Sequence, residues 1–443
     1  MPPFHFPRRD FLRSCAVLTA GAALPAWYRA EARKVATRVP PGPNDRPKVA
    51  LIGCGGMGRY DAKLASAFGD VVALCDVDAA RLDQAGADYP KARQFRDFRE
   101  CLSAGGADVI INGTPDHWHT LINLAAVRAR QDVYSEKPLT LTLEEGQRLV
   151  KAVRATGAVL QTGSQQRSDA RFRLAVELVR NGRLGRLKHV TTSLPSGPRG
   201  GPFATSPAPA SLDWDAWQGQ TPVTPYVKER CHGTFRYWWE YSAGTLTDWG
   251  AHHNDIALWG IGEAGPVAVE GHALQDPVPG GYSFPSTFYV HFRYASGVTH
   301  TCRTVETEGG SGNVLNPGTP PGQMSNGVLF EGSAGWIFVS RGKIAASDPG
   351  ILQEPLTRRT WTAEVSDNHM GNFFDSVRRR TRPICDVEVG HRSVSVCHLG
   401  GIAIRLGRRL VWDPAAERFV GDREANRWVG REQRRGFTYA SVA

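Results

Sequence analysis

The sequence predicts an α/β protein with an N-terminal Rossmann parallel sheet and a C-terminal α+β domain that contains a large, mostly antiparallel open sheet. Three observations predict this fold. A buried strand runs into a glycine-rich turn after residue 47, strand and helix patterns alternate as far as residue 162, and alternating strand patterns return after about residue 280. A chain of 443 residues is long enough for two domains. We therefore expect three segments, namely a leader over 1–38, the Rossmann domain over 47–162 and the second domain over 163–443.

The leader has the pattern of an export signal. Arg8 and Arg9 stand before Asp10-Phe11-Leu12, and a weakly apolar run follows over residues 14–27. Paired arginines before such a run are typical of the bacterial twin-arginine signal. The run is too short and too rich in alanine and glycine to predict a stable membrane span. We expect export to the periplasm or cell envelope. The cleavage position is left open, and an uncleaved leader that anchors the chain is the alternative.

Charge and cysteine usage argue against two other classes of protein. The net charge is +10, but residues 1–38 hold seven basic and two acidic residues and so contribute half of it. The sequence has no basic stripe with interleaved aromatic residues, and we expect no nucleic-acid partner. The eight cysteines are irregularly spaced and form no C-x-x-C pair. We therefore expect neither a disulfide framework nor a metal site.

The first element of the Rossmann domain is a buried strand over residues 48–52, which runs into Gly53-Cys54-Gly55-Gly56-Met57-Gly58. In this G-x-G-x-x-G spacing, Gly53 permits a tight turn, Gly55 lets the backbone approach a pyrophosphate, and Gly58 lets the next helix pack closely on the strand. The N-terminus of that helix then faces the phosphates. The motif therefore predicts a dinucleotide site that includes Gly53, Gly55, Met57 and Gly58.

The second strand, over residues 71–75, favours NAD as the cofactor. It ends at Asp76, about where the acid that binds the ribose hydroxyls belongs in such a fold. Asp76 and the nearby Asp78 would repel the 2′-phosphate of NADP. Arg81 is close enough in the sequence to favour that phosphate, and NADP remains the alternative.

Three later strands bring further polar motifs to one edge of the sheet. The strands cover 108–113, 132–135 and 159–162, and the motifs 114–119, 136–138 and 163–167 follow them. Because ligands bind at the carboxyl ends of the strands in an open α/β sheet, these motifs predict a single site. The residues singled out are Thr114, Pro115, His119, Glu136, Lys137 and Arg167. Arg167 is a candidate for binding substrate hydroxyls or the cofactor, with a surface ion pair as the alternative.

The first part of the second domain is rich in aromatic residues. A helix over 171–181 and a strand over 187–193 precede a proline- and glycine-rich loop at 195–225, and six of the twelve tryptophans lie within residues 214–259. Aromatic faces stack well on sugar rings, although we expect at least half of these residues to build the core. Arg236 and Tyr237 are candidate pocket residues.

The remainder of the second domain predicts an open sheet. Antiparallel strand patterns cover 287–294, 299–305, 327–331 and 336–340, and helices are predicted over 368–380 and 389–409. A glycine- and proline-rich loop at 308–326 is expected to be exposed or to form a lid. A sheet with one free face suits association. We therefore expect a homodimer or homotetramer.

Four motifs in this order resemble the Gfo/Idh/MocA family, that is, glucose–fructose oxidoreductase, inositol dehydrogenase and their relatives. They are the glycine-rich turn, Thr114-Pro115 with His119, Glu136-Lys137-Pro138, and the segment 244–255 that contains Asp248, His252 and His253. The resemblance extends from Lys48 to the C-terminus. It implies an NAD(P)-dependent oxidoreductase acting on CH–OH groups. In such an enzyme Lys137 would line the nicotinamide and bind or deprotonate the substrate hydroxyl, and Asp248 and His252 would complete the catalytic set.

The spacing of Asp248 and His252 fits that implied role. Residues four apart share one face of a helix, and a carboxylate beside an imidazole raises its basicity. A base is needed because an alcohol releases hydride only as its proton is taken. The alternative is that Asp248 is a helix N-terminal acid and His252 a core residue. His253 is either a substrate contact or another core residue.

The resemblance implies a carbohydrate-like substrate, namely a sugar, cyclitol or glycoside. Because no pool of free nicotinamide is expected outside the cytoplasm, we expect the cofactor to be held tightly. The alternative function is an NAD-dependent glycosidase or lyase that oxidises a sugar hydroxyl transiently and eliminates a neighbouring group.

Overall fold

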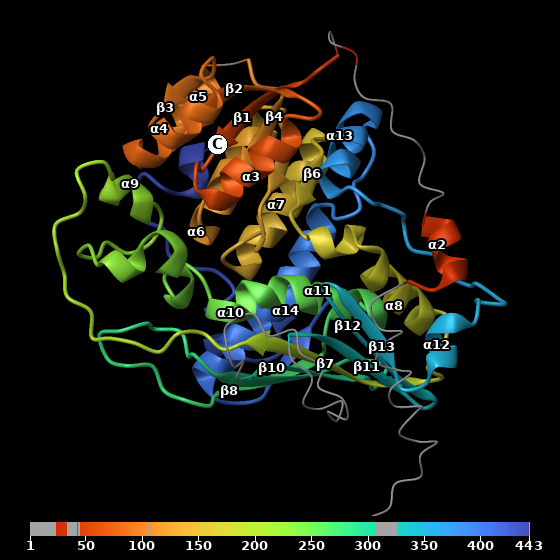
Figure 1. Ribbon diagram of the computed structural model, residues 1–443. Coiled ribbons are helices and arrows are strands. Elements are labelled where there is room, and N and C mark those ends of the chain that lie inside the picture. Colours follow the sequence, from red (N-terminus) through yellow and green to blue (C-terminus); the bar gives the residue numbers. More distant parts are fainter. Residues whose placement is uncertain (1–23, 33–41, 43–44, 105, 306–325, 443) are drawn as a thin grey trace, which may run out of the picture.

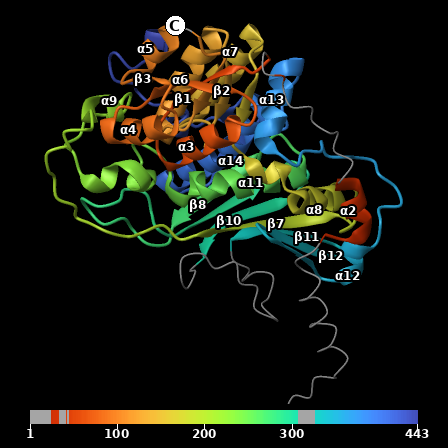
Figure 2. The ribbon, with the colours of Figure 1, turned by 45° about the horizontal axis from the view of Figure 1, so that its top comes forward.

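The computed structural model describes residues 24–32, 42, 45–104, 106–305 and 326–442 (Figure 1). The twin-arginine motif and nearly all of the predicted 308–326 loop lie outside these residues. The described chain forms two sheets, and helices α11 (Trp249–Ile261) and α14 (Val387–Leu406) lie between them (Figure 2). The predicted fold class is confirmed.

The first sheet is a six-stranded parallel sheet in the order β3-β2-β1-β4-β5-β6. Its strands are β1 Lys48–Ile52, β2 Asp70–Cys75, β3 Arg93–Phe95, β4 Val109–Asn112, β5 Asp132–Ser135 and β6 Leu160–Thr162. The connecting helices are α3 Gly56–Ala65, α4 Ala79–Asp88, α5 Phe98–Ser103, α6 Asp116–Arg128 and α7 Leu143–Thr156. Every residue of β4 and β5 is buried, as expected of a sheet covered on both faces.

The second sheet has nine strands in the order β13-β12-β11-β7-β10-β9-β8-β14-β15. They are β7 Leu187–Pro195, β8 Ala268–Ala273, β9 Phe288–Arg293, β10 Thr299–Val305, β11 Gly327–Gly332, β12 Gly335–Ser340, β13 Lys343–Ala346, β14 Leu410–Asp413 and β15 Arg418–Phe419. Strands β7 and β10 pair in parallel, and the other pairs are antiparallel. Burial alternates along β9, so one face of the sheet packs on the core.

Shorter elements make up the rest of the described helices and turns. The remaining α-helices are α2 Ala26–Ala32, α8 Ala170–Arg180, α9 Trp214–Gln218, α10 Gly244–Thr247, α12 Pro349–Gln353, α13 His369–Arg379 and α15 Arg423–Asn426. The 3₁₀ turns are η1 Gln165–Ser168, η2 Lys228–Arg230, η3 His232–Tyr237 and η5 Tyr439–Val442.

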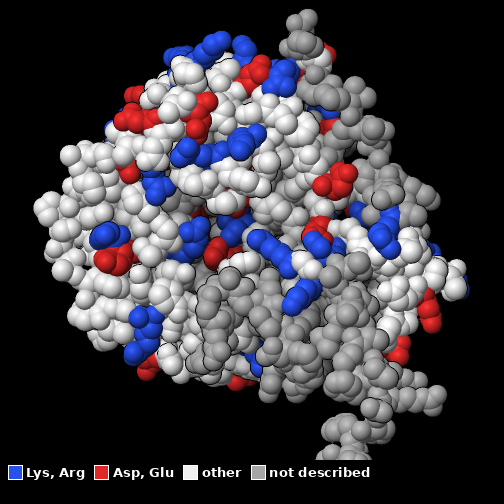
Figure 3. Space-filling model, viewed as in Figure 1, with Lys and Arg blue, Asp and Glu red and all other residues white. Residues whose placement is uncertain are grey.

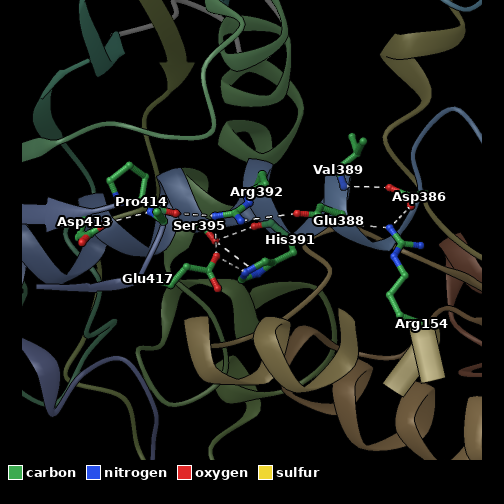
Figure 4. A network of polar contacts seen from close by, with 11 residues as sticks. Arg154, Asp386, Glu388, Val389, His391, Arg392, Ser395, Asp413, Pro414 and Glu417 are labelled. Atoms are coloured by element: carbon green, nitrogen blue, oxygen red, sulfur yellow. Dashed lines mark hydrogen bonds and ion pairs between the residues drawn. The ribbon is translucent and has the colours of Figure 1, made fainter. Parts of the chain in front are cut away.

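The C-terminal helices join the two halves. Phe373 and Phe374 of α13 are buried in the Rossmann core. A polar network holds the N-terminal half of α14 (Figure 4). Within it Glu417 Oε1 lies 2.7 Å from both His391 Nε2 and Arg392 Nη1, while Arg154 of α7 pairs with Asp386, the residue before α14. The Rossmann sheet is therefore covered in part by residues from the far end of the sequence.

Helix α2 shows that part of the predicted leader belongs to the folded body. Tyr28 is buried, and its hydroxyl accepts a hydrogen bond of 2.7 Å from Arg173 Nε in α8. The indole of Trp27 donates to the carbonyl of Leu352 at 3.0 Å. Residues 24–32 of the predicted leader segment therefore pack on the second domain, as an apolar run with two aromatic residues can, and the bounds of the leader stay a prediction.

Candidate active site at the carboxyl edge of the Rossmann sheet

The glycine-rich turn is shaped as its spacing predicts. Gly53 has φ +90°, and a Cβ there would lie 2.5 Å from the backbone nitrogen of Thr114. A Cβ on Gly58 would lie 1.9 Å from the carbonyl oxygen of Gly53. Only glycine fits these positions. Helix α3 begins directly after Gly55, so its free N–H groups face the space where a pyrophosphate binds.

A cavity of about 360 Å³ lies against this turn. Predicted cofactor residues that line it are Gly53, Gly55, Met57, Asp76, Thr114 and Pro115. The opposite wall comes from the second domain and the C-terminal tail, through Trp217, His232, Phe235, Arg236 and Phe437. A glycine cradle, a helix N-terminus and an acid at the end of β2 fit a dinucleotide.

Asp76 lies immediately after β2, as predicted. Its carboxylate accepts hydrogen bonds from the backbone nitrogens of Cys54, at 2.7 Å, and Asp78, at 2.9 Å. Burial raises the pKa of Asp76, and these N–H groups act in the opposite direction. Arg81 also lines the cavity, and its guanidinium lies over Gly55. Both groups that bear on the choice between NAD and NADP therefore meet at the ribose end of the cavity.

His119 connects two segments beside the site. Its Nδ1 lies 2.7 Å from the carbonyl oxygen of Pro138, and its Nε2 lies 2.8 Å from that of Thr114. Burial lowers the pKa of His119 to about 4, so the neutral ring donates to one of the two carbonyls. His119 therefore links the turn after β4 to the Glu136-Lys137-Pro138 segment and does not line the cavity. Glu136 is buried, and its Oε1 accepts a 3.0 Å hydrogen bond from Gln165.

Lys137, Asp248 and Arg236 form the charged centre of the site. The Nζ of Lys137 lies 2.5 Å from Asp248 Oδ1, and the Nε of Arg236 lies 3.4 Å from the same oxygen. Although burial favours the neutral acid, the two cations hold the pKa of Asp248 below its usual value. Arg236 also lines the cofactor cavity. The structure thus brings these three predicted residues together across the two domains.

His252 does not pair with Asp248, so that expectation is wrong. The chain turns at Asp248, with ψ −82°, and this residue separates α10 from α11 instead of continuing one helix. His252 is buried, and its Nδ1 has no hydrogen-bond partner among the described residues. Burial lowers the pKa of His252 well below its usual value, and Lys137 acts in the same direction. His252 is therefore a neutral imidazole close to the charged centre.

The other predicted substrate residues divide into two groups. Tyr237 lies beside the centre, where burial and the charge of Asp248 raise its pKa. His253 is fully buried, stacks on Trp249 and lies 3.0 Å from the amide oxygen of Asn326 through Nε2. Arg167 makes two 2.7 Å bonds to Asp255. The structure therefore shows Arg167 in an ion pair, which was the alternative left open by the sequence. The pair is buried and does not lie at the surface.

Asp116 was not singled out from the sequence. It begins α6, and its Oδ2 accepts a 2.5 Å hydrogen bond from the hydroxyl of Ser242. Burial raises the pKa of Asp116 to about 7, against the opposing effect of Arg236 and Lys137. A carboxyl group that titrates near neutral pH can store a proton beside the charged centre. The sequence signal that could have identified Asp116 was its position within the 114–119 motif, directly after a strand.

Comparison with known proteins identifies the family of this chain. The model of the family's NAD-binding Rossmann domain matches residues 47–164, and that of its C-terminal α/β domain matches residues 201–308 and 326–439. The chain belongs to the Gfo/Idh/MocA oxidoreductase family. The Rossmann half of this family member is an NAD-binding domain, as the sequence predicted.

Curated relatives of this Gfo/Idh/MocA protein include inositol dehydrogenases. Myo-inositol 2-dehydrogenase of Thermotoga maritima is 24% identical over 56% of this chain and 66% of its own length. Inositol 2-dehydrogenase of Pseudarthrobacter chlorophenolicus is 32% identical over 34% of this chain and 47% of its own length. The chain therefore spans less than two thirds of the length of these relatives.

Solved structures share the fold. The WlbA dehydrogenase of Bordetella pertussis, in complex with NADH and UDP-GlcNAcA, has a TM-score of 0.61 at 21% identity, over 83% of this chain and 99% of that one. A levoglucosan dehydrogenase in complex with NADH and L-sorbose has a TM-score of 0.61 at 16% identity, over 83% and 98%. At these identities the likeness establishes the fold alone.

The surface charge and the described helices bear on which partners the protein can bind. On the face in Figure 3, basic and acidic side chains are interspersed instead of gathering in a stripe of one sign. Among the described helices, none has the length and apolar character to cross a membrane. The described residues contain no group of three or more histidine, cysteine or acidic side chains placed to hold a metal ion.

Proposed function

We propose that this protein transfers hydride between NAD and a secondary hydroxyl or keto group of a sugar, cyclitol or glycoside. The observation that carries the proposal is the contact of Lys137 with Asp248, 2.5 Å apart, beside Arg236, which itself lines the cofactor cavity. The names of the inositol dehydrogenase relatives support a polyhydroxylated substrate.

The charged centre suits alcohol oxidation. Held by the glycine-rich turn and Asp76, bound NAD would supply the hydride acceptor, and the substrate hydroxyl must lose its proton to a residue of the protein. Lys137 orients the substrate oxygen and stabilises the charge that develops on it. Asp248 holds the ammonium group in place, and Arg236 and Tyr237 flank the same carboxylate. His252, a neutral imidazole whose buried Nδ1 has no hydrogen-bond partner among the described residues, is the candidate for proton exchange with the substrate.

We further propose that the cofactor is NAD and is held tightly through the catalytic cycle. The wall formed by Trp217, His232 and Phe437 supports tight binding, because the second domain and the tail face the dinucleotide across the cavity. Asp76, which lines the cavity, favours NAD, and Arg81 is the group through which NADP would bind instead. Asp78 does not line the cavity and caps helix α4. A retained cofactor also suits the second candidate function, a glycosidase or lyase that oxidises a sugar hydroxyl transiently and later returns the hydride.

One purification tests these proposals together. The protein is isolated without added cofactor and denatured, and any released nicotinamide is identified. A panel of sugars, cyclitols and glycosides is then tested with and without added NAD. Reduction of added NAD by an empty protein supports a conventional dehydrogenase and contradicts tight binding. Bound NAD with turnover that needs no added NAD supports a redox-neutral reaction. No turnover of any member in either format contradicts the proposed substrate class.

Export by the twin-arginine route, to the periplasm or cell envelope, is proposed on the motif at residues 8–12. This route carries folded proteins and therefore suits an enzyme that binds its cofactor before export. Replacement of Arg8 and Arg9 by lysine is expected to keep the protein in the cytoplasm, as measured by cell fractionation. Alternate residues of β9 are exposed or half-exposed, and such a partly open sheet face supports a homodimer or homotetramer. Light scattering of the purified protein measures its mass.

A further inference from the structure

Helix α2 lies where a signal peptidase would have to choose between two sites. Residues 1–38 contain two Ala-x-Ala sequences, Ala20-Gly21-Ala22 and Ala30-Glu31-Ala32, and small residues in this pattern mark cleavage sites. Cleavage after Ala22 leaves α2 on the protein, whereas cleavage after Ala32 removes it. The sequence alone does not distinguish the two.

The contacts of α2 are those of a core element. Tyr28 is 1% exposed and belongs to the main hydrophobic core of the second domain, and Leu24 and Trp27 pack against that core. Trp27 also donates to the carbonyl oxygen of Leu352 at 3.0 Å and packs edge-on to Tyr28. In Figure 1, α2 lies beside α8 and α12. Removing this helix would therefore expose part of the core.

Polar contacts make the loss of Tyr28 more damaging. Arg173 is 3% exposed, and its Nε donates to the Tyr28 hydroxyl at 2.7 Å. The guanidinium also lies 5.4 Å from the centre of the Tyr28 ring. Glu177, buried on the same helix, accepts a hydrogen bond from the backbone nitrogen of Ala363 at 3.1 Å. Without Tyr28, the buried guanidinium of Arg173 would lose a hydrogen-bond acceptor, and loss of a partner for a buried polar group is destabilising.

We propose that the leader is cleaved after Ala22, so that the mature protein begins at Ala23 and keeps helix α2 as part of its fold. The cleavage step rests on the proposed export. The structural role of α2 stands without it. Because the twin-arginine route carries folded proteins, α2 would already be docked when the peptidase acts, and the Ala30-Glu31-Ala32 sequence would be held within a helix.

The structural role is tested on chains made without a leader. Chains 23–443 and 33–443 are purified and melted under identical conditions. The shorter chain is expected to melt lower by on the order of 5 °C or more, since loss of a large buried aromatic side chain is among the more costly changes. Tyr28→Ala in the longer chain is expected to reproduce most of the loss, and Arg29→Ala, at an exposed position of the same helix, almost none. Equal melting temperatures for the two chains would overturn the role of α2.

The cleavage site is tested by N-terminal sequencing of the extracytoplasmic protein made from the full chain. Sequencing that begins at Ala23 supports the proposal. Sequencing that begins at Arg33, or an exported protein that keeps its leader, overturns it. A full-length protein found only in the cytoplasm contradicts the export proposal instead, and the melting experiment still decides the role of α2.

Discussion

Lys137 and Asp248 carry the proposed chemistry as a pair. Each is held by the other, because the ammonium group and the carboxylate are 2.5 Å apart in a largely buried setting. Asp248 keeps its charge through two cations, Lys137 and Arg236. Removal of Lys137 would therefore eliminate the group proposed to contact the substrate and would also release the carboxylate of Asp248 from its position.

The first prediction concerns Lys137→Ala. Turnover is expected to fall on the order of a hundredfold or more, the scale for losing a positioned proton-transfer group. The amount of NAD released on denaturation is expected to fall much less than turnover, because the glycine-rich turn and Asp76, which line the cofactor cavity, are unchanged. Lys63→Ala, at an exposed position of α3, is the matched control. Near-normal turnover in Lys137→Ala would refute the site assignment.

The second prediction concerns the pH dependence of Asp116. Burial raises the pKa of Asp116 to about 7 in the folded protein, well above the value of an exposed aspartate. The folded state therefore holds a proton that the unfolded state has already lost, so the contribution of this group to stability falls as pH rises from about 4 to about 7. In Asp116→Asn, this decrease in stability with rising pH should be absent.

The free energies of unfolding of the wild type and Asp116→Asn, measured in denaturant at pH 5 and pH 8, test this sign. The variant should gain relative to the wild type at pH 8. A constant difference between the two proteins at both pH values would mean that Asp116 does not titrate in this range.

Single positions differ in how far the sequence could predict them. Gly53 and Gly58 were predictable because their requirement is steric and local. The contact of Lys137 with Asp248 joins residues 111 positions apart, and only the resemblance to the family placed both in one site. Arg167 pairs with Asp255 of α11 and Asp116 accepts a hydrogen bond from Ser242, so both depend on contacts with the second domain that no local pattern specifies.

At the scale of elements, the break between α10 and α11 decides the geometry of the site. The four-residue spacing of Asp248 and His252 predicted one continuous helix. Instead, α10 ends at Thr247, whose Oγ1 accepts a 3.0 Å hydrogen bond from the backbone N–H of Ala243. The chain then turns at Asp248 before α11 begins. The carboxylate consequently reaches Lys137 and not His252. This turn at Asp248 is not visible in residue periodicity.

The third prediction concerns the network at α14 in Figure 4. Although burial opposes it, the hydrogen bond from His391 and the charges of His391 and Arg392 hold the pKa of Glu417 below its usual value. Glu417→Gln is expected to destabilise the protein by about 1–3 kcal/mol at pH 7, the range for a hydrogen bond to a charged group.

Because the folded pKa of Glu417 is lowered, this stability is present above the unfolded pKa and is lost as pH falls through the folded pKa. The difference between Glu417→Gln and the wild type in urea unfolding should therefore shrink below about pH 4. Glu388→Gln, a half-exposed member of the same network, is the control and should cost less than about 1 kcal/mol. Equal losses in the two variants would contradict this account.

At the scale of the whole molecule, the two halves are less separate than their sequence order suggests. The first sheet was predicted except for β3, since burial and alternation are local patterns, whereas β8, β13, β14 and β15 of the second sheet were not predicted. The sequence did not show that α13 and α14 would pack against the Rossmann half, or that Phe437 would reach the cofactor cavity. These contacts join residues hundreds of positions apart, and they enclose the proposed cofactor between the domains.

That enclosure leads to the last prediction. Trp217 and Phe437 line the cavity opposite the glycine-rich turn, and Phe437 also packs edge-on to Trp118. Trp217→Ala and Phe437→Ala should each open this wall and speed the exchange of bound NAD by about tenfold, because a large buried aromatic group contributes more than 1.4 kcal/mol to such contacts. Exchange is measured as the loss of labelled NAD from the purified protein into excess unlabelled NAD. Trp361→Ala, far from this wall, controls for general loosening. If both wall variants exchange NAD at the wild-type rate, the retention of the cofactor must come from the Rossmann half alone.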